Sequence, residues 1–463
     1  MRRTISSLLA AILALLSLSA CGETAEMSAD LAASDNTTEI TEEKTQEQPR
    51  EEVEPQDVTT LRIAWWGTQT RHDRTIAALN LYEEFHPEIK FDYDFYTYED
   101  YFTKLDELAA SGEVWDIFQL GGNFPQYIDE IYPFDEFLSS GEVQFPGISE
   151  VNLKTTQTAD GVQLGITNGI NTYGIAYDPD MFEEAGAKLP TDDWTWDEYE
   201  EAADLISEKL GSFGSSTFRL SEFNAGCTTY IAQQGSLGQY SFYNSDYTGM
   251  GFEDPHMLTP YIKMRADMIK KGSYPNSYNA RNVTSYENDF LVTGEAAMTF
   301  VAVNQFPALY DICKEQGRTL ALTTIPRIKK DGNSGVQIQS SQMFCIAQDS
   351  ENKKAAADFI EWFETSIDCN KILQAERGIP ADDSVRASLA IGADEGQQIM
   401  YDFVGKVSSF PAPDDTNNLS PEGHEQLREN YREYIDLVAK EEMTADEAAE
   451  KIYSDALLLF DQG

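Results

Sequence analysis

Strand-like and helix-like segments alternate between residues 60 and 122, and this alternation restricts the fold more than any other feature of the chain. The strand-like segments TLRIAWW, IKFDYDFY and VWDIFQLGG begin at residues 60, 89 and 114, and IKFDYDFY alternates apolar with polar residues. The helix-like segments 74–87 and 98–112 separate them and end at Pro87 and Gly112. Strands that alternate with helices predict an α/β fold with a parallel sheet and right-handed crossovers.

Ligands of such sheets bind beyond the carboxyl ends of the strands, so the residues that follow the first and third strands are candidates. They are Trp66 to Gln69 and Gly121 to Asn123. Gly67 ends the first strand beside Trp66, which favours Trp66 as the exposed tryptophan and Trp65 as the buried one. The alternative is that both tryptophans belong to the core.

The chain is long enough for two compact cores, and it is strongly acidic. About 400 residues follow Leu61, which is more than one core needs. The formal net charge is −47 at pH 7. Because phosphates would be repelled, this charge argues against nucleic acid as a partner. It also argues against phosphorylated or sulfated ligands, unless a local basic pocket overrides the field.

The N-terminus is typical of an exported protein. Arg2 and Arg3 precede an apolar run that is too short to span a bilayer comfortably, so residues 1–20 are interpreted as a signal peptide. The sequence Leu18-Ser19-Ala20-Cys21 resembles the lipobox of bacterial lipoproteins. The resemblance implies that Cys21 is lipidated and becomes the first residue, with acyl chains as the membrane anchor. The alternative is an ordinary signal peptide followed by a chance cysteine.

Residues 22–60 do not have the composition of a folded domain. They contain twelve acidic residues, two basic ones and no aromatic residue. Such a stretch cannot bury enough apolar surface to offset its chain entropy. Together with Cys21 it predicts a disordered acidic tether, which would place the protein on the outer face of the cell membrane.

Cysteine, histidine and short-motif patterns give no sign of a metal, a cofactor or a catalytic centre. The four remaining cysteines are widely spaced without a CxxC pair, which excludes a typical zinc or dithiol motif. We interpret them as buried thiols, although export also permits disulfides. The four histidines are far apart, and no GxSxG, Walker or HExxH motif occurs. The cysteines are Cys227, Cys313, Cys345 and Cys369, and the histidines are His72, His86, His256 and His424.

Two classes of exported protein stay open as alternatives to the function given below. One is a secreted carbohydrate-active hydrolase, and the other is an adhesin or structural lipoprotein.

Four segments in order resemble the family 1 extracellular solute-binding proteins, the maltose-binding-like receptors of ABC importers. They are TYGIAYDPDMFEEAGAKLPTDDWTWDEYEEAADLISEKL (172–210), FLVTGEAAMTF (290–300), CIAQDSENKKAAADFIEWF (345–363) and GIPA (378–381). In the first segment, Thr195 and Glu198 have the spacing of a helix-capping box. Trp196, just inside that helix, is expected to pack rather than to bind.

The resemblance implies a two-lobed, type II periplasmic-binding-protein-like fold, in which each lobe is a mixed sheet flanked by helices. It places lobe 1 at 61–170 and 341–405, and lobe 2 at 171–340 and 406–463. Hinge crossings are expected near NGINTYG (168–174), GVQIQSS (335–341) and VGKVSSF (404–410).

For function, the resemblance implies capture of a carbohydrate, specifically an oligosaccharide, by closure of the lobes. The protein would then deliver it to the permease subunits of an ABC importer, without catalysis and as a monomer. Only the lipid anchor would contact the membrane.

Sugar binding needs aromatic faces for the pyranose ring and planar polar groups for its hydroxyls. Asn304 stands where the family often has an aromatic residue, and QSSQ (339–342) replaces a glycine-rich stretch. Tyr173 has the alternative role of packing between the lobes, and Arg377 is interpreted as a brace for the GIPA loop. The strand ends and the resemblance together give the ligand-binding candidates Trp66, Gln69, Arg71, Asn123, Asn171, Tyr173, Glu222, Phe223, Asn224, Asn304, Ser341 and Gln342.

Overall fold

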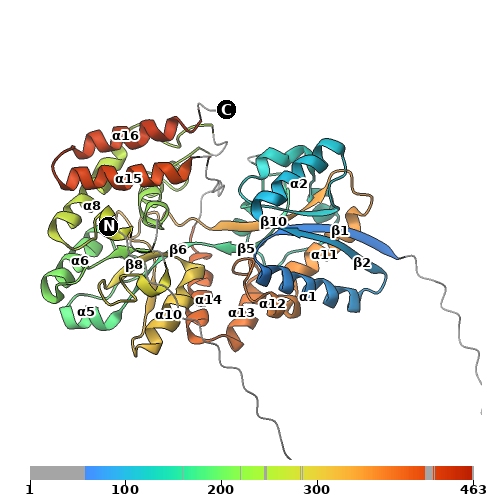
Figure 1. Ribbon diagram of the computed structural model, residues 1–463, viewed down its shortest axis with the longest axis horizontal. Helices are drawn as coiled ribbons and strands as arrows, with labels where there is room; N and C mark the ends of the chain where they lie inside the picture. Colours follow the sequence, from blue (N-terminus) through green and yellow to red (C-terminus); the bar gives the residue numbers. More distant parts are fainter. Residues whose placement is uncertain are drawn as a thin grey trace, which may run out of the picture. The chain divides into compact units, whose positions relative to one another are not determined.

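The computed structural model describes residues 58–158, 160–218, 221–244, 248–281, 283, 285–411, 421 and 423–460. The predicted signal peptide, Cys21 and nearly all of the acidic tether lie outside the described residues. The described chain contains two β-sheets with helices around them (Figure 1), which confirms the predicted α/β fold class.

The first sheet contains the parallel strands that the opening alternation predicts. Its strands are β1 (Thr59–Trp66), β2 (Ile89–Tyr96), β3 (Ile117–Leu120), β4 (Ile131–Tyr132), β5 (Ile166–Asn171) and β10 (Gln339–Ala347). Their order is β2-β1-β3-β10-β4, and β5 pairs with β10. β1 is parallel to β2 and β3, whereas β10 is antiparallel to its three neighbours. A strand from much later in the chain therefore completes this sheet.

Helices connect and cover these strands. They are α1 (Gln69–Phe85), α2 (Tyr98–Ser111), α3 (Asp135–Ser140), α4 (Glu150–Lys154), α11 (Lys353–Thr365), α12 (Ile367–Leu373) and α13 (Asp383–Gly392), with the 3-10 helix η1 (Phe124–Glu130). α1 begins five residues before the predicted helix because the Thr68 side chain accepts a hydrogen bond from the Arg71 N–H and caps it. Gly112 caps the carboxyl end of α2, and its φ of +68° suits a residue without a Cβ atom.

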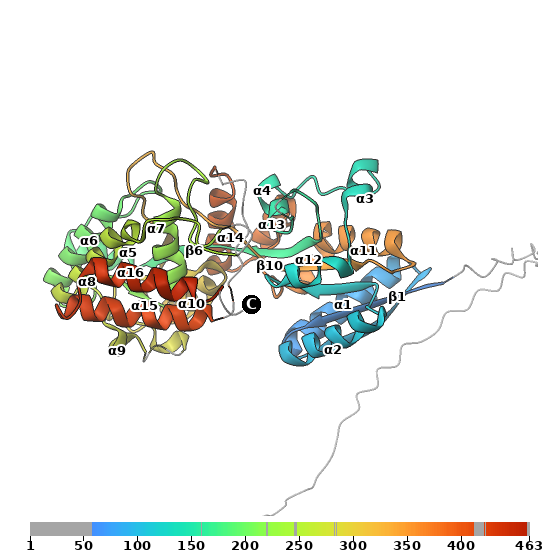
Figure 2. The same cartoon turned by 90° about the horizontal axis from the view of Figure 1, so that it is seen from above.

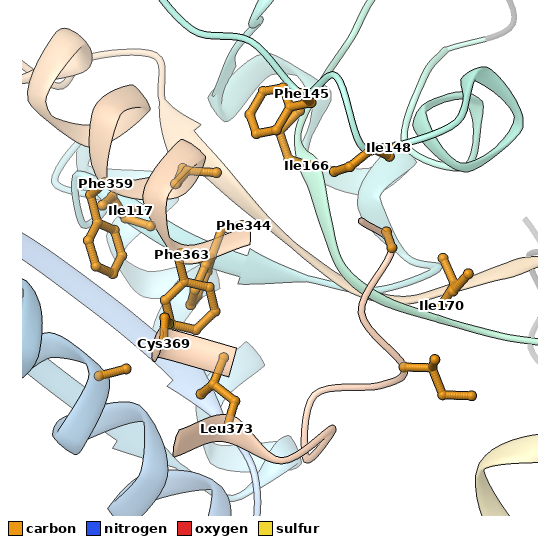
Figure 3. Close-up of a cluster of buried hydrophobic side chains, with 14 of the residues drawn as sticks. Ile117, Phe145, Ile148, Ile166, Ile170, Phe344, Phe359, Phe363, Cys369 and Leu373 are labelled. Atoms are coloured by element: carbon orange, nitrogen blue, oxygen red, sulfur yellow. The ribbon is translucent and has the colours of Figure 1, made fainter. Parts of the chain in front are cut away.

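The core of this half lies between the first sheet and α11 and α12. Figure 3 shows Phe344 of β10 and Ile117 of β3 close to Phe359 and Phe363 of α11. These four side chains are fully buried, and Leu373 of α12 belongs to the same cluster. This burial holds β10 against helices that directly follow it in sequence.

The second sheet has the order β7-β8-β6-β9. It consists of β6 (Tyr173–Tyr177), β7 (Ser216–Thr217), β8 (Met298–Ala302) and β9 (Ala321–Thr323). Helices with it are α5 (Pro179–Ala185), α6 (Trp196–Leu210), α7 (Thr228–Ala232), α8 (Thr259–Lys271), α9 (Ser277–Ala280), α10 (Phe306–Glu315), α14 (Glu395–Val407), α15 (His424–Ala439) and α16 (Ala445–Leu457). Shorter turns are the π-helix η2 (Phe223–Cys227) and the 3-10 helices η3 (Pro255–Leu258), η4 (Tyr286–Asn288) and η5 (Val303–Gln305). α15 packs on both α8 and α16, and α15 and α16 lie side by side in Figure 1.

The capping box predicted for α6 is present. The Glu198 N–H donates to Thr195 Oγ1 at 3.3 Å, and the Thr195 N–H donates to Glu198 Oε2 at 2.9 Å. Trp196 is only 4% exposed, and its Nε1–H donates to Gln233 Oε1 at 2.9 Å. The prediction that Trp196 packs in the core is therefore confirmed.

The chain passes between the two sheets more than once (Figure 2). β5 ends at Asn171 in the first sheet, and β6 begins at Tyr173 in the second. β9 of the second sheet is followed by β10 of the first. α14 packs on α10 and β9, and it also contacts α13. The residue boundaries given above for the two lobes stay predictions.

None of the described helices has the length and apolar character needed to cross a bilayer.

Candidate ligand-binding site

The carboxyl edge of the first sheet brings Trp66 and Asn123 together. An added Cβ on Gly121 would lie 3.7 Å from the Trp66 ring and 3.8 Å from Asn123 Oδ1, so both side chains lie beside this glycine. Asn123 Oδ1 accepts a hydrogen bond from the Gly121 N–H at 3.3 Å. Two neighbouring parallel strands thus place an aromatic ring and an amide at one edge, as expected for strand ends.

The two adjacent tryptophans differ as the sequence predicts. Trp65 is fully buried and donates its Nε1–H to His72 Nδ1 at 3.1 Å. Trp66 is half-buried, and its ring contacts Tyr98, Tyr101 and Phe102 of α2 at centroid distances of 5.1–5.5 Å. The helix therefore fixes the orientation of the Trp66 ring while part of the ring stays accessible.

Arg71 and Gln69, on the first turn of α1, have protein partners. Arg71 donates to the Trp66 carbonyl at 3.4 Å and to the Glu376 carbonyl at 3.0 Å. Burial lowers the pKa of Arg71, and the Glu376 carboxylate partly opposes this. Gln69 is exposed and donates to Asp73 at 2.8 Å. Arg71 thus ties the end of β1 to the loop before Gly378, and contact with a ligand stays a prediction for both residues.

Arg377 braces that loop from inside the core, in line with its interpretation from sequence. It is 1% exposed and donates to Thr75 Oγ1 at 3.0 and 3.3 Å and to Gln119 Oε1. Burial, followed by the charge of Arg71, lowers the pKa of Arg377 to about 9, although Glu364 opposes the shift.

Ser341 and Gln342 lie where β10 passes β5 through an irregular register. The Ser341 hydroxyl donates to the carbonyls of Gly169 and Arg377. Gln342 is opposite Gly169 and immediately precedes Met343, the partner of Leu120 in β3. Gln342 therefore lies next to Gly121 at the edge that carries Trp66.

The same region holds amide groups without partners. Gln342 Oε1 and both amide atoms of Asn168 are buried and have no hydrogen-bond partner among the described residues. A buried amide left unpaired costs about 1–3 kcal/mol, so these groups carry hydrogen-bonding capacity that the described chain does not use. Asn168 was not among the candidates from sequence. An asparagine within the strand-like run ITNGIN, where its type is disfavoured, was the available signal.

Asn171 and Asn304 join the two sheets directly. Asn171 Nδ2 donates to Asn304 Oδ1 at 3.1 Å, and the Asn304 N–H donates to Asn171 Oδ1 at 3.2 Å. Asn171 ends β5, and Asn304 lies in η5 just after β8. Asn304 is exposed and Asn171 is half-buried, so this reciprocal pair lies at the surface of the crossing.

Tyr173 and Asn224 form a second polar contact, two residues further along. Asn224 Nδ2 donates to the Tyr173 hydroxyl at 3.0 Å, and both side chains are half-buried. The other two residues of this predicted group, Glu222 and Phe223, are buried instead. Phe223 contacts Phe242 and Tyr431 in the core.

Glu222 belongs to a buried ion pair. Its Oε1 lies 3.4 Å from Arg265 Nε and accepts hydrogen bonds from the hydroxyls of Tyr261 and Tyr431. The Arg265 guanidinium also lies 4.2 Å from the centre of the Tyr274 ring. A cavity of about 30 Å³ adjoins Glu222 and Arg265. These contacts give Glu222 a structural role, and ligand contact by Glu222 and Phe223 stays a prediction.

The four described cysteines, Cys227, Cys313, Cys345 and Cys369, are buried free thiols, as interpreted from the sequence. Burial raises the pKa of the Cys345 thiol well above its usual value. In the described part of the chain, no group of three or more histidine, cysteine or carboxylate side chains is placed to hold a metal ion.

The candidates thus fall into two groups, joined by β5 and β10. Trp66, Asn123 and Gln342 lie at the edge of the first sheet, and Asn171, Asn304 and Tyr173 lie at the crossing to the second.

A model of the bacterial extracellular solute-binding protein family matches residues 69–366. The chain belongs to this family. The resemblance predicted from the four segments is therefore confirmed.

Three proteins that are similar to this chain have names that describe the binding of a solute. A lactose-binding protein of Rhizobium radiobacter is 24% identical over 337 residues, which cover 71% of this chain and 75% of the relative. A family 1 extracellular solute-binding protein of Alicyclobacillus acidocaldarius has a similar structure, with a TM-score of 0.75 and 23% identity, covering 87% of this chain and 99% of that one. A periplasmic oligogalacturonide-binding protein of Yersinia enterocolitica gives a TM-score of 0.73 at 20% identity, with coverages of 87% and 99%. At these identities the structural matches establish the fold.

Proposed function

We propose that this solute-binding protein captures an oligosaccharide outside the cell and delivers it, chemically unchanged, to the permease of an ABC importer. The names of two similar proteins, one lactose-binding and one oligogalacturonide-binding, support a sugar as the solute. The lipobox-like LSAC sequence supports an anchor at Cys21, which would keep the receptor near that permease.

One observation carries the proposal. A half-buried tryptophan, Trp66, and a buried amide, that of Gln342, lie next to Gly121 at the same edge of the first sheet, and Gln342 Oε1 has no hydrogen-bond partner among the described residues. An aromatic face suits the apolar side of a pyranose, and amides suit its hydroxyl groups. From that edge, β5 leads to Asn171 and Asn304, so a ligand with several sugar units could reach both groups.

A thermal-shift screen with lactose, maltotriose, raffinose and digalacturonic acid tests the proposal. A sugar present at about 100 times its Kd adds about 2.7 kcal/mol to the free energy of unfolding, which raises the Tm measurably. We expect at least one oligosaccharide to stabilise the protein. Stabilisation by peptides or polyamines alone would move the protein out of the sugar class.

The sugar recovered from each mixture tests the absence of catalysis. Chromatography should return it unchanged in amount and identity after long incubation. New reducing ends, formed in proportion to protein concentration, would instead identify a hydrolase.

The reciprocal amide pair gives a site-directed test. Asn171→Ala and Asn304→Ala should each keep the cooperative unfolding of the parent protein but should bind the stabilising sugar more weakly. Gln398→Ala, an exposed change on α14, is the matched control and should bind as the parent does.

A further inference from the structure

Four side chains from separate parts of the sequence form a continuous hydrogen-bonded chain that ends at Tyr173. Asn224 of η2 donates its Nδ2–H to the Tyr173 hydroxyl at 3.0 Å. Asn224 Oδ1 lies 3.2 Å from Nε2 of His424, the first residue of α15. His424 Nδ1 lies 2.8 Å from the Tyr243 hydroxyl. Residues some 250 positions apart in sequence thus meet in one relay.

The direction of each hydrogen bond follows from the asymmetry of the Asn224 amide. Because its NH₂ group faces Tyr173, its carbonyl oxygen faces His424, so His424 Nε2 must carry the proton and donate. In a neutral imidazole, Nδ1 then has no proton and accepts from the Tyr243 hydroxyl. The Tyr173 oxygen accepts from Asn224, which leaves the Tyr173 hydroxyl proton available to donate elsewhere.

The surroundings of His424 favour the neutral ring that this direction requires. His424 is 5% exposed and lies against the rings of Phe223 and Tyr243. It begins a helix of 16 residues, and the positive end of the helix dipole disfavours an imidazolium there. Burial, and to a lesser extent the charge of Arg428, lowers the pKa of His424 to about 4.

Tyr173 lies where a ligand that reaches the crossing would meet it. It pairs with Ala302 at the end of β8, two residues from Asn304, and it is two residues from Asn171. Within the described part of the chain, Asn224 is the one hydrogen-bond partner of its hydroxyl.

We propose that the relay from Tyr243 through His424 and Asn224 fixes the Tyr173 hydroxyl as a hydrogen-bond donor to the bound sugar. The inference rests on the proposed function and names a positioning role for Asn224 and His424. A fixed donor selects a ligand that presents an acceptor at this point, such as a hydroxyl, ring or carboxylate oxygen. It disfavours a protonated amine, which can only donate.

Asn224→Asp reverses the relay with almost no change in shape. A carboxylate at position 224 accepts hydrogen bonds from both neighbours. The Tyr173 hydroxyl then donates to this carboxylate and no longer to the sugar. We expect Asn224→Asp and Tyr173→Phe each to raise the Kd about tenfold for the sugar that stabilises most among lactose, maltotriose, raffinose and digalacturonic acid. The double variant should bind no more weakly than either single variant, because both remove the same donor. Gln398→Glu adds an equal charge on an exposed part of α14 and should leave the Kd unchanged.

The imidazole tautomer gives a readout that a merely structural role would not predict. Nitrogen NMR of the purified protein labelled with ¹⁵N-histidine should show His424 protonated at Nε2 at pH 7, with the signal assigned by its loss in His424→Gln. Protonation at Nδ1 would overturn the relay, even if both other variants failed to fold. A Kd unchanged by Asn224→Asp and Tyr173→Phe would overturn the donor role while leaving the proposed function intact. Failure of every sugar to bind the parent protein would remove the proposed function and this inference with it.

Discussion

The partly accessible ring of Trp66 makes a residue-level prediction about affinity. Trp66→Ala removes the aromatic face at the edge of the first sheet, and loss of one stacking ring costs about 1–3 kcal/mol by analogy with base stacking. The Kd measured by titration calorimetry for the stabilising sugar should therefore rise by roughly 5- to 150-fold. Trp362→Ala removes another half-buried tryptophan, which packs against Tyr82 on α1. It should lower the Tm without changing the Kd, and an equal effect of both variants on the Kd would contradict a stacking role.

Asp289 and His424 titrate with opposite effects on stability over the same range of pH. Burial raises the pKa of Asp289 from 3.8 to about 6, so the folded state holds the extra proton and stability falls as pH rises through this interval. Burial lowers the pKa of His424 from 6.5 to about 4, so the unfolded state holds the extra proton and stability rises with pH there. Each contribution amounts to roughly 3 kcal/mol, so the two largely cancel between pH 4 and 6.

Single substitutions should expose each contribution separately. Asp289→Asn keeps an acceptor for the Leu291 N–H, and its urea midpoint should increase with pH from 4 to 6 more steeply than that of the parent. His424→Gln should show the reverse trend, and the double variant should return close to the parent slope. Parallel pH profiles for all four proteins would show that neither group titrates as described.

At the residue scale, the sequence predicted the structural features that depend on residues close by in the chain. The contrast between Trp65 and Trp66 followed from Gly67, and the cap of α6 followed from Thr195 and Glu198. The buried ion pair of Glu222 could not be predicted, because its partner Arg265 and the hydroxyl of Tyr431 lie 43 and 209 residues away. The partners of His424 are equally remote, so its role had no local signal.

At the scale of elements, alanine substitutions at two glycines test backbone packing and helix propensity separately. A Cβ atom on Gly169 of β5 would lie 2.7 Å from the backbone of Gly378, so Gly169→Ala should force β5 and the loop that contains Gly378 apart and destabilise by about 1–3 kcal/mol. Gly405 is exposed within α14 and has open space around it. Gly405→Ala should stabilise by about 0.5–1 kcal/mol, because alanine restricts the unfolded chain and favours helix. Urea unfolding measures both changes, and destabilisation by Gly405→Ala or tolerance of Gly169→Ala would contradict these backbone contacts.

Element order was predictable where strand and helix patterns alternate, and less so where strands come together from afar. The parallel pairing of β1 with β2 and β3 followed from the opening segments. The antiparallel insertion of β10 between β3 and β4 joins residues more than 200 positions apart, and the family resemblance indicated only that the chain returns to the first lobe near residue 341. The irregular register between β5 and β10, which positions Gln342, has no signal in composition or periodicity.

For the whole molecule, the LSAC sequence predicts where the protein resides. Cys21→Ala removes the thiol that would be acylated, so the variant should be released into the soluble fraction, whereas the parent should partition into detergent. Intact mass should show the parent beginning at Cys21 with added acyl chains. A Cys21→Ala variant that stays membrane-bound with an unchanged mass would contradict lipidation. Cys345→Ala, a change at a buried thiol, is the control and should not alter partitioning.

Closure of the two halves is the remaining prediction at this scale. The chain passes from one sheet to the other within Asn171–Tyr173 and again between β9 and β10, so changes of a few backbone dihedrals in both connections can reorient the sheets. A sugar that contacts both groups of candidates gains contacts on closure, and it shifts the equilibrium by that difference in free energy. Small-angle scattering should therefore give a smaller radius of gyration at saturation with the stabilising sugar than with a sugar that leaves the Tm unchanged. Trp66→Ala should need a higher sugar concentration for the same decrease. A radius of gyration that stays constant at proven saturation would mean that binding does not depend on closure.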